Sequence, residues 1–515
     1  MVAGSGTGNM DSPVQAAGER SGESWLSGSL LVIICFGIVV RLWLMHAAHA
    51  TEEDFYITLR YVENLATGHG FVYNQGEQVL GVTTPLYAIL LAGFARVGLD
   101  PLLWSKLIGI AADACTALIV CRIGRNLGRP GAGLAAAGLV MISPTNLIWA
   151  TKGMEVGIVA AVVAAVWCLW IEKREIAAWT LVAILLLLRI DGAALAVVML
   201  VATIVRERRL PMRGVAVFTL VVAPWMLYAA HTYGSPLPLS VSAKLMVYGK
   251  LIPGRFPQLR AFIGLMLHNP IGLVCIPGCL FCFVLLLSEI VRSVRPRELA
   301  ILPALVWMGI YYSGMALSHV VLFGWYFVPP TPILYLGGCV GIAMAANAVK
   351  LKLPELRQER ARAGIAALTI AFGAVTVPRC AATLIEGQRV ERQLRIPIGM
   401  WMREHALPTE TLMLEPIGYI GYYSRMRILD VIGLISPEAL PSYRADVPSP
   451  DHDLWRRLRP DWLLLRAGQM KALTAYESHL PLADRLNTGY RLANKWSDPA
   501  RRDHGVDFYL YRRLR

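Results

Sequence analysis

Residues 51–77 read TEEDFYITLRYVENLATGHGFVYNQGE and follow directly on an apolar run over residues 26–46. The segment opens with three consecutive acids, Glu52, Glu53 and Asp54. It continues with aromatic residues, an arginine and a histidine, and it ends in an Asn-Gln-Gly turn signal. A run of apolar residues as long as the preceding one is typical of a membrane helix, so this polar segment marks the edge of a membrane.

The composition of the chain is that of a membrane protein. Apolar residues make up 56% of its 515 residues and charged residues only 16%, which is beyond what a soluble globular protein carries. The formal charge of +14 comes from basic residues in short loops between apolar runs, and no basic and aromatic interleaving indicates a nucleic-acid partner. The cysteines lie in or beside apolar runs, so we expect helix packing from them rather than disulfides or a metal site.

The apolar runs predict a polytopic α-helical protein in the lipid bilayer of the cell (plasma) membrane. A bilayer core requires about 20 apolar residues per helix. One further run, 85–99, is ambiguous, and placing it at the interface puts all the basic loops on one side of the membrane. We therefore expect about 11 crossings, with the N-terminus cytoplasmic and the C-terminus outside. The predicted crossings are 26–46, 104–121, 131–148, 154–171, 177–189, 192–205, 213–230, 271–291, 299–317, 327–347 and 364–384.

Changes in composition divide the chain into three parts. Residues 1–22 are rich in Gly, Ser and Ala and predict a disordered cytoplasmic tail. Residues 23–385 form the membrane domain, with a first outer loop at 50–84. In residues 386–515 the charges return to ordinary density, and short apolar runs alternate with amphipathic stretches. This last part predicts a soluble extracytoplasmic α/β domain.

Every segment with motif character falls on the outer side in this topology, which predicts a single site at the outer membrane face. These segments are 50–84, 150–156, 188–192, 231–244, 318–327 and the C-terminal domain. Arg189 and Asp191 interrupt an apolar stretch, where an unpaired charge costs several kcal/mol. They either pair with each other around a helix break, or Arg189 holds a phosphate.

The motifs resemble those of a known family. EDFYITLRYVENLATGHGFVYNQGEQVLGVTTPLY (53–87) is similar to the first outer loop of GT-C fold glycosyltransferases that use lipid-linked sugars, in the branch of the actinobacterial terminal β-arabinofuranosyltransferase. GMEVGIV (153–159), RIDG (189–192) and YGSPLPLSVSAK (233–244) resemble further motifs of this branch, and residues 418–438 resemble its soluble domain. The resemblance implies a GT-C fold and transfer of a sugar from a polyprenyl phosphate to a cell-envelope glycan or lipid-linked acceptor. Arabinofuranose is the favoured sugar and mannose the runner-up.

Sugar transfer with inversion requires a base for the acceptor hydroxyl and cations for the departing phosphate. Asp54 is the first choice for the base and Glu53 the second. The resemblance implies that Arg189, Lys244 and Arg60 bind the donor phosphate. The further substrate-binding candidates are His69, Glu155, Asp191 and Tyr326.

Each assignment has a structural alternative. The acids could instead favour the N-terminal end of a helix, His69 could be a turn residue, and Tyr326 could belong to an aromatic belt. No metal-ligand spacing is recognisable, although the outer acid pair could recruit a divalent cation. The rival function is a transporter or flippase of a lipid-linked sugar. Transporters commonly repeat an interrupted helix in both halves, and the interruption at 189–192 has no such counterpart.

Overall fold

The structure is a computed structural model that describes residues 13–251, 256, 258–267, 270–294, 296–349, 358–498 and 507–514. The helices of the membrane part are α1 (Pro13–Ala48), α2 (Glu53–Ala66), α3 (Pro85–Arg96), α4 (Pro101–Asn126), α5 (Pro130–Ile142), α6 (Pro144–Ala150), α7 (Val156–Ile171), α8 (Glu175–Leu188), α9 (Gly192–Glu207), α10 (Met212–Tyr233), α11 (Leu239–Leu251), α12 (Leu259–Leu267), α13 (Pro270–Val291), α14 (Leu302–Leu317), α15 (Thr331–Ala348) and α16 (Gln358–Val390). Helix α1 extends into the N-terminal segment predicted to be disordered, of which residues 1–12 lie outside the described residues.

The eleven apolar runs predicted as crossings all fall in helical segments. By length and composition, seven helices among the described residues can cross a membrane, or eight if α5 and α6, bent by 50° at Ser143, form one span. Helices α7, α8 and α9 account for the other three runs and have only 16, 14 and 16 residues. The predicted α-helical membrane fold is confirmed.

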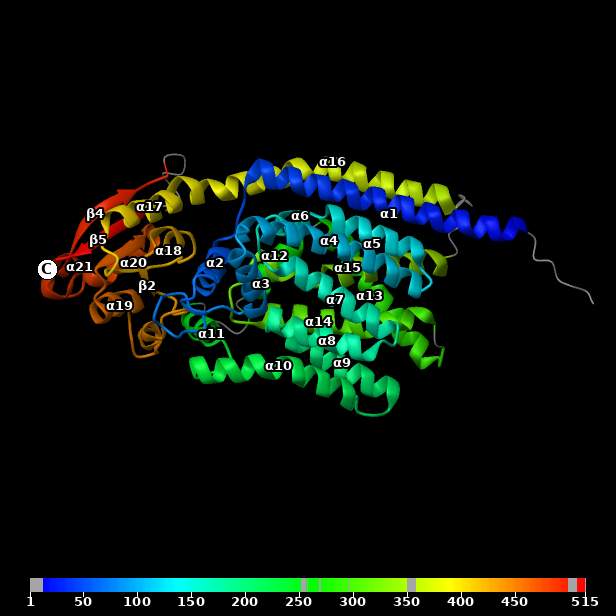
Figure 1. Ribbon diagram of the computed structural model, residues 1–515, viewed down its shortest axis with the longest axis horizontal. Helices are drawn as coiled ribbons and strands as arrows, with labels where there is room; N and C mark the ends of the chain where they lie inside the picture. The colour runs from blue at the N-terminus through cyan, green and yellow to red at the C-terminus, as the bar shows by residue number, and fades with distance from the viewer. Residues whose placement is uncertain are drawn as a thin grey trace, which may run out of the picture.

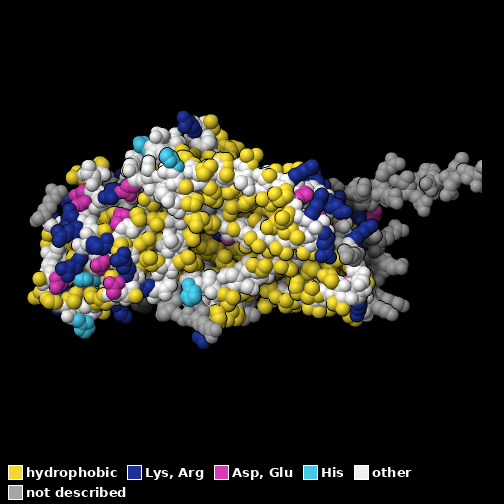
Figure 2. Space-filling view, turned by 90° about the horizontal axis from the view of Figure 1, so that it is seen from below, with side chains coloured by type: hydrophobic (Ala, Val, Ile, Leu, Met, Phe, Trp, Pro, Cys, Tyr) yellow, Lys and Arg dark blue, Asp and Glu magenta, His cyan; other side chains and the backbone are white. Residues whose placement is uncertain are grey.

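The helices run along the long axis of the molecule, and the C-terminal domain covers one end of the bundle (Figure 1). Helices α1 and α16 lie side by side along one edge, and α10 lies along the opposite edge. Apolar side chains cover the middle of the molecule, whereas charged side chains gather at its two ends (Figure 2). This distribution is that of a bundle with an apolar belt for the lipid.

The segment between α1 and α4 does not carry the chain to the other end of the bundle. Lys106, in the second turn of α4, donates a hydrogen bond from Nζ to the carbonyl oxygen of Ala50, just after α1, at 2.6 Å. The end of α1 and the start of α4 therefore lie together. Helix α3, with 12 residues, is too short to span a bilayer. This geometry agrees with the expectation that residues 85–99 stay at the membrane edge.

The basic loops lie together at the end of the bundle away from the C-terminal domain. Arg129 pairs with Glu298 at 2.9 Å, which joins the α4–α5 loop to the segment before α14. Arg206, near the end of α9, donates to the carbonyl oxygen of Trp170 at 2.7 Å, at the end of α7. Lysine and arginine side chains accordingly dominate this end in Figure 2. A concentration of basic loops on one side is typical of the cytoplasmic face of a membrane protein.

Three short helices meet near the C-terminal domain. Glu155 lies at the N-cap of α7, Arg189 at the C-cap of α8 and Asp191 at the N-cap of α9. A helix of 16 residues is about 24 Å long, less than the bilayer core of about 30 Å. Helices α7, α8 and α9, with 16, 14 and 16 residues, are therefore each shorter than the bilayer core.

The C-terminal domain contains a five-stranded sheet in the order β2-β1-β3-β5-β4. Strand β1 pairs in parallel with β2 and β3, whereas β5 pairs in antiparallel with β3 and β4. The central strands read TLML and WLLLR and are mostly buried, as expected for strands covered on both faces. The strands are β1 (Thr411–Leu414), β2 (Arg427–Asp430), β3 (Trp462–Arg466), β4 (Tyr490–Trp496) and β5 (Phe508–Arg513), and the helices are α17 (Ile396–His405), α18 (Tyr419–Ser424), α19 (Pro450–Leu458), α20 (Ala467–Glu477) and α21 (Leu486–Gly489).

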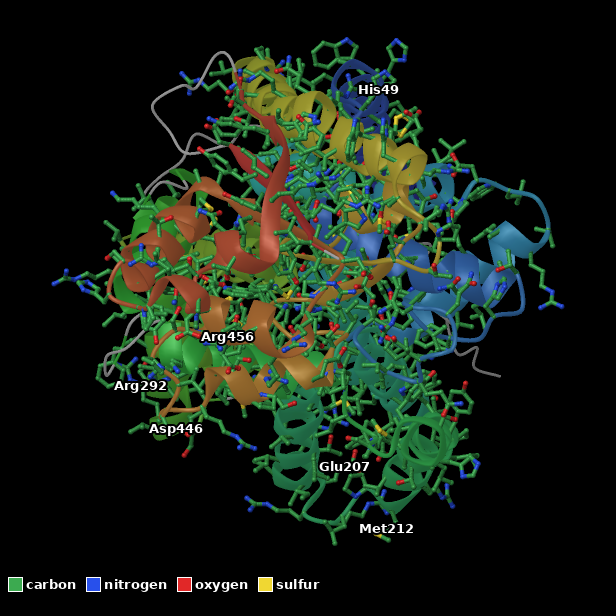
Figure 3. The ribbon with its side chains drawn as sticks, turned by 90° about the vertical axis from the view of Figure 1, so that its left-hand side faces the viewer. His49, Glu207, Met212, Arg292, Asp446 and Arg456 are labelled. Atoms are coloured by element: carbon green, nitrogen blue, oxygen red, sulfur yellow. The ribbon has the colours of Figure 1, made fainter. Side chains whose placement is uncertain are left out.

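Seen from the domain end, the domain lies over one part of the bundle and leaves the α9–α10 hairpin to one side (Figure 3). Glu207 and Met212 mark that hairpin at the lower edge of the view, and Arg456 of α19 lies on the domain. Helix α2 lies between the domain and the bundle (Figure 1). This arrangement brings α2 into contact with both parts of the protein.

Candidate active site

A polar cavity of about 70 Å³ lies where α2, the short-helix junction and α11 meet. Five of the residues predicted from sequence line it together: Asp54, Glu155, Arg189, Lys244 and Tyr326. They come from segments up to 272 positions apart (326 − 54) in the chain. The cavity therefore brings together side chains from several of the segments with motif character.

Asp54 lies in the first turn of α2 and faces this cavity. Ile57 and Thr58, three and four positions later, line the same cavity because residues at that spacing share one face of a helix. Among the described residues, Asp54 has no hydrogen-bond or ion-pair partner. A carboxylate with open lone pairs in a polar cavity can accept a proton from a bound hydroxyl group.

Glu53, the adjacent acid, points to the C-terminal domain instead. Its Oε1 accepts hydrogen bonds from the backbone nitrogens of Gly418 at 2.6 Å and Tyr419 at 3.3 Å, at the start of α18. Its Oε2 pairs with Arg395 at 3.3 Å. Burial raises the pKa of Glu53 to about 8, against the opposing effect of Arg395. Glu53 is thus engaged in docking the domain, and it does not line the cavity that contains Asp54.

Arg189 is held by two carboxylates. Its Nη1 lies 2.7 Å from Oε1 of Glu155, and its Nη2 lies 3.0 Å from Oδ2 of Asp191. The Tyr311 hydroxyl adds a hydrogen bond to Asp191 at 3.3 Å. The pairing of Arg189 with Asp191, one of the two alternatives from the sequence, is therefore present, with Glu155 as a second partner. The cluster carries a net charge of −1, and Arg189 still lines the cavity.

Lys244 also lines the cavity and, unlike Arg189, has no carboxylate partner among the described residues. It lies on α11, shortly after the Pro-Leu-Pro segment 236–238, and its side chain is half-buried. The part of the chain that the structure describes offers it neither a hydrogen bond nor an ion pair. Its ammonium group can therefore receive an anion without first breaking an existing contact.

Tyr326 and Trp325 form an aromatic wall of the cavity. They lie on the short 3₁₀ helix η2 (Gly324–Phe327), and Trp325 stacks on Phe323 with ring centroids 4.3 Å apart. The Arg189 guanidinium lies 5.4 Å from the centre of the Tyr326 ring. An amphipathic aromatic ring beside polar groups can pack against the face of a sugar.

Arg60 and His69 lie away from this cavity. The guanidinium of Arg60 donates to the carbonyl oxygens of Tyr73 at 2.9 Å, Gly421 at 2.5 Å and Met426 at 2.5 Å. These contacts use all three guanidinium nitrogens, Nε, Nη1 and Nη2, and two of them join Arg60 to the C-terminal domain. We therefore do not assign Arg60 to the donor phosphate. His69 is exposed and bonds through Nδ1 with Thr67 Oγ1 at 2.9 Å, beside a different cavity.

Several lining residues were not predicted from sequence. Thr58 follows Asp54 by one helical turn, so helical periodicity along α2 was a signal that could have identified it. Ser240 lies four positions before Lys244 on α11, and its buried Oγ has no hydrogen-bond partner within the described residues. Thr84 and Leu434 join the cavity only through tertiary packing. A serine hydroxyl without a partner in such a cavity can bind a polar ligand.

The proposed cation at the outer acid pair has no support from the side-chain directions. Glu53 and Asp54 face opposite neighbours, the domain and the cavity. Within the described ranges, no group of three or more His, Cys, Asp or Glu side chains is placed to hold a metal ion.

Comparisons with known proteins place the whole chain in one fold. A search of curated protein sequences gave no match, and residues 383–511 match the sequence model of a domain of unknown function, DUF8728. The structure of ArnT from Cupriavidus metallidurans bound to undecaprenyl phosphate is similar with a TM-score of 0.60 and 14% identity, over 94% of this chain and 98% of that chain. The Archaeoglobus fulgidus oligosaccharyltransferase AglB, in complex with an inhibitory peptide and a dolichol-phosphate, is similar with a TM-score of 0.54 and 13% identity, over 93% of this chain and 74% of that chain. The protein therefore has the GT-C fold of membrane glycosyltransferases.

Proposed function

We propose that the protein is an inverting glycosyltransferase that moves a sugar from a polyprenyl phosphate to a cell-envelope glycan or lipid-linked acceptor. The observation that carries this proposal is that Asp54 and Lys244, whose side chains have no hydrogen-bond or ion-pair partner among the described residues, line one cavity of the GT-C fold. The two groups supply the base and the anion site that such a transfer requires.

The reaction is a single displacement at the anomeric carbon of the donor. Asp54 takes the proton of the acceptor hydroxyl as the acceptor oxygen forms a bond to the anomeric carbon. The bond from that carbon to the phosphate oxygen breaks, and polyprenyl phosphate leaves with the electron pair. Lys244 stabilises the negative charge that grows on the departing phosphate. The carboxylate of Asp54 also stabilises positive charge that develops on the sugar ring.

Arg189 has a secondary part in phosphate binding. Its charge is already offset by Glu155 and Asp191, so a phosphate that approaches the Arg189 cluster meets a net charge of −1. Arg189 can therefore orient the donor phosphate only if the positive charge of Lys244 attracts that phosphate into the cavity. Its main effect is to hold the short-helix junction in place around the cavity.

Two neighbours of the same fold support a polyprenyl-phosphate donor, since ArnT was solved with undecaprenyl phosphate and AglB with a dolichol-phosphate. Arabinofuranose is the sugar that we favour, because the outer-loop motifs resemble those of the arabinofuranosyltransferase branch. The basic loops at the far end of the bundle support an orientation with the C-terminal domain and the cavity outside the plasma membrane.

The test is an assay of the purified protein in detergent with synthetic polyprenyl-phosphate arabinofuranose or polyprenyl-phosphate mannose. An octyl glycoside of the same sugar serves as the acceptor. We expect acceptor-dependent release of polyprenyl phosphate and a product with inverted anomeric configuration. Absence of release with both donors, or a product with retained configuration, would contradict the proposal.

The orientation is tested by cysteine labelling in intact cells. Cysteines placed at the exposed positions Gln75 and Lys471 should react with an impermeant maleimide added outside, whereas one at the exposed Arg209 should not. The parent protein with its own cysteines gives the background. Labelling at Arg209 without labelling at Gln75 would reverse the proposed orientation.

A further inference from the structure

A second and larger cavity, of about 640 Å³, lies against a different face of α2. Tyr56, Leu59 and Glu63 line it from α2, whereas Asp54, Ile57 and Thr58 line the cavity described above. Helix α18 of the C-terminal domain forms a second wall, and residues 98–102 at the α3–α4 turn form a third. The volume is in the range of cavities that hold small organic ligands.

Three tyrosines from two parts of the chain form one wall of this cavity. The ring of Tyr56 lies 5.0 Å from that of Tyr422 and 5.7 Å from that of Tyr423, between ring centroids. The hydroxyl groups of Tyr56 and Tyr423 lie 3.4 Å apart. Tyr422 and Tyr423 are half-buried, so part of each ring faces the cavity.

Two of the three charged residues that line the cavity, Glu63 and Arg425, pair with each other, and the third, Asp100, caps α4 by accepting a hydrogen bond from the Leu102 nitrogen. Glu63 accepts a hydrogen bond from the Tyr422 hydroxyl at 2.6 Å and pairs with Arg425, whose Nη2 lies 3.0 Å from Glu63 Oε1. The Arg425 guanidinium also lies 4.9 Å from the centre of the Tyr422 ring. Because this pair is already neutralised, the wall that it forms does not select an anionic ligand.

We propose that this cavity binds a carbohydrate segment of the acceptor, several sugar residues away from the hydroxyl that reacts. Tyrosine rings present apolar faces for the C–H groups of a sugar and hydroxyl groups for its oxygens. His69 and Gln75 add exposed polar side chains to the lining of the cavity. This inference rests on the proposed function, because it assumes a glycan acceptor.

The location of the cavity predicts a dependence on acceptor length. An α-helix with its side chains is about 10–12 Å across, and α2 separates this cavity from Asp54. A single sugar that reacts at Asp54 cannot also contact the tyrosines. An oligosaccharide can reach both, so only long acceptors gain from this subsite.

The experiment compares two acceptors with the same octyl group, one with a single arabinofuranose and one with an oligoarabinofuranoside. In Tyr423→Ala we expect the KM of the oligosaccharide to rise about 10-fold, because the variant loses an aromatic ring against which the face of a sugar can pack. The KM of the monosaccharide acceptor and of the donor should stay unchanged. Tyr423→Phe keeps the ring and should retain most of the affinity for the oligosaccharide.

A second variant keeps the test valid if Tyr423→Ala does not fold. Leu99 lines the cavity from the α3–α4 turn and is 38% exposed. The larger side chain in Leu99→Trp should occupy part of the cavity and raise the KM of the oligosaccharide without changing that of the monosaccharide acceptor. Equal KM values for both acceptors in the wild-type protein, or an unchanged oligosaccharide KM in both variants, would overturn the subsite while leaving the proposed function intact. Absence of transfer to either acceptor would instead refute the proposed function and the subsite with it.

Discussion

Two faces of helix α2 carry charged residues, and the faces differ in whether these residues have partners within the protein. The face toward the polar cavity presents Asp54, which has no partner among the described residues. The face toward the C-terminal domain presents Glu53, Arg60 and Glu63, and each of them bonds to residues between Arg395 and Met426. The same helix therefore serves as a wall of the site and as the docking surface of the domain.

This difference shows that the partners of a charged side chain indicate its role. A buried charge that is satisfied by backbone groups and ion pairs stabilises a particular arrangement of chain segments. A charge without partners in a cavity has a cost that a ligand can offset. The two kinds of charge sit at adjacent positions in residues 53 and 54, so proximity in sequence does not imply a shared function.

The largest expected effect separates these adjacent acids. Asp54→Asn keeps the size of the side chain but removes its ability to take a proton, so turnover should fall by about 10² to 10⁴. Donor binding and thermal stability should change little. Glu53→Gln is the matched control and should retain most of the turnover, measured as polyprenyl phosphate released. Normal turnover in Asp54→Asn together with an inactive Glu53→Gln would exchange the two roles.

The second prediction concerns the docking face. Arg60→Ala removes hydrogen bonds to three carbonyl oxygens and leaves buried acceptors unpaired, which should destabilise the protein by about 3 kcal/mol. Thermal unfolding in detergent, followed by tryptophan fluorescence, measures this change. Lys244→Ala serves as the control because it removes a cation without partners, and its unfolding midpoint should stay near that of the wild type. An unchanged midpoint in Arg60→Ala would remove the distinction between the faces.

The third prediction concerns the cation of the cavity. Lys244→Ala should weaken binding of a polyprenyl-phosphate donor by about 10-fold, since a charge-assisted hydrogen bond is worth about 1.5–3 kcal/mol. Titration with the reaction product, polyprenyl phosphate, measures the affinity for the phosphate that donor and product share. Lys250→Ala, on the same helix but bonded to the carbonyl oxygens of Arg444 and Val447, is the control for loss of charge. Equal affinities in all three proteins would place the phosphate elsewhere.

The smallest expected effect is a pH dependence of domain docking. Burial raises the pKa of Glu53 to about 8 in the folded protein, above its ordinary value of 4.5. The folded state therefore holds this proton more tightly than the unfolded chain. Its contribution to stability is complete below about pH 4.5 and is lost as the pH rises toward 8. The ion pair with Arg395 and the backbone donors act against burial and lower the pKa of Glu53.

Glu53→Gln tests this dependence because glutamine does not titrate in that range. The difference between the unfolding midpoints at pH 5 and pH 8 should be smaller in Glu53→Gln than in the wild type. Asp54→Asn is the control and should keep the wild-type difference. An equal difference in all three proteins would show that another group causes the pH dependence.

The sequence predicted much of the site, including the pairing of Arg189 with Asp191 as one of two alternatives, but not the neighbours of Arg60 and His69. The outer motifs brought Asp54, Lys244 and Tyr326 into one proposed pocket, and the structure places them in one cavity. The same motifs assigned Arg60 and His69 to that pocket, whereas the structure directs them to other neighbours. Helical periodicity along α2 could have separated Arg60 from the face of Asp54, whereas His69 lies after the end of that helix, where periodicity gives no signal.

The sequence by itself determined the membrane class, the helical runs and the presence of an α/β domain. These properties follow from hydrophobicity summed over neighbouring residues, which is a local quantity. Only the tertiary structure decided that Glu53 docks the domain while Asp54 faces the cavity, and that Arg189 is shared between Glu155 and Asp191. Successive residues on a helix point about 100° apart, so the partners of each depend on which distant segment packs against that side. Residues 395–426, more than 320 positions after the end of α2, supply those partners for the docking face.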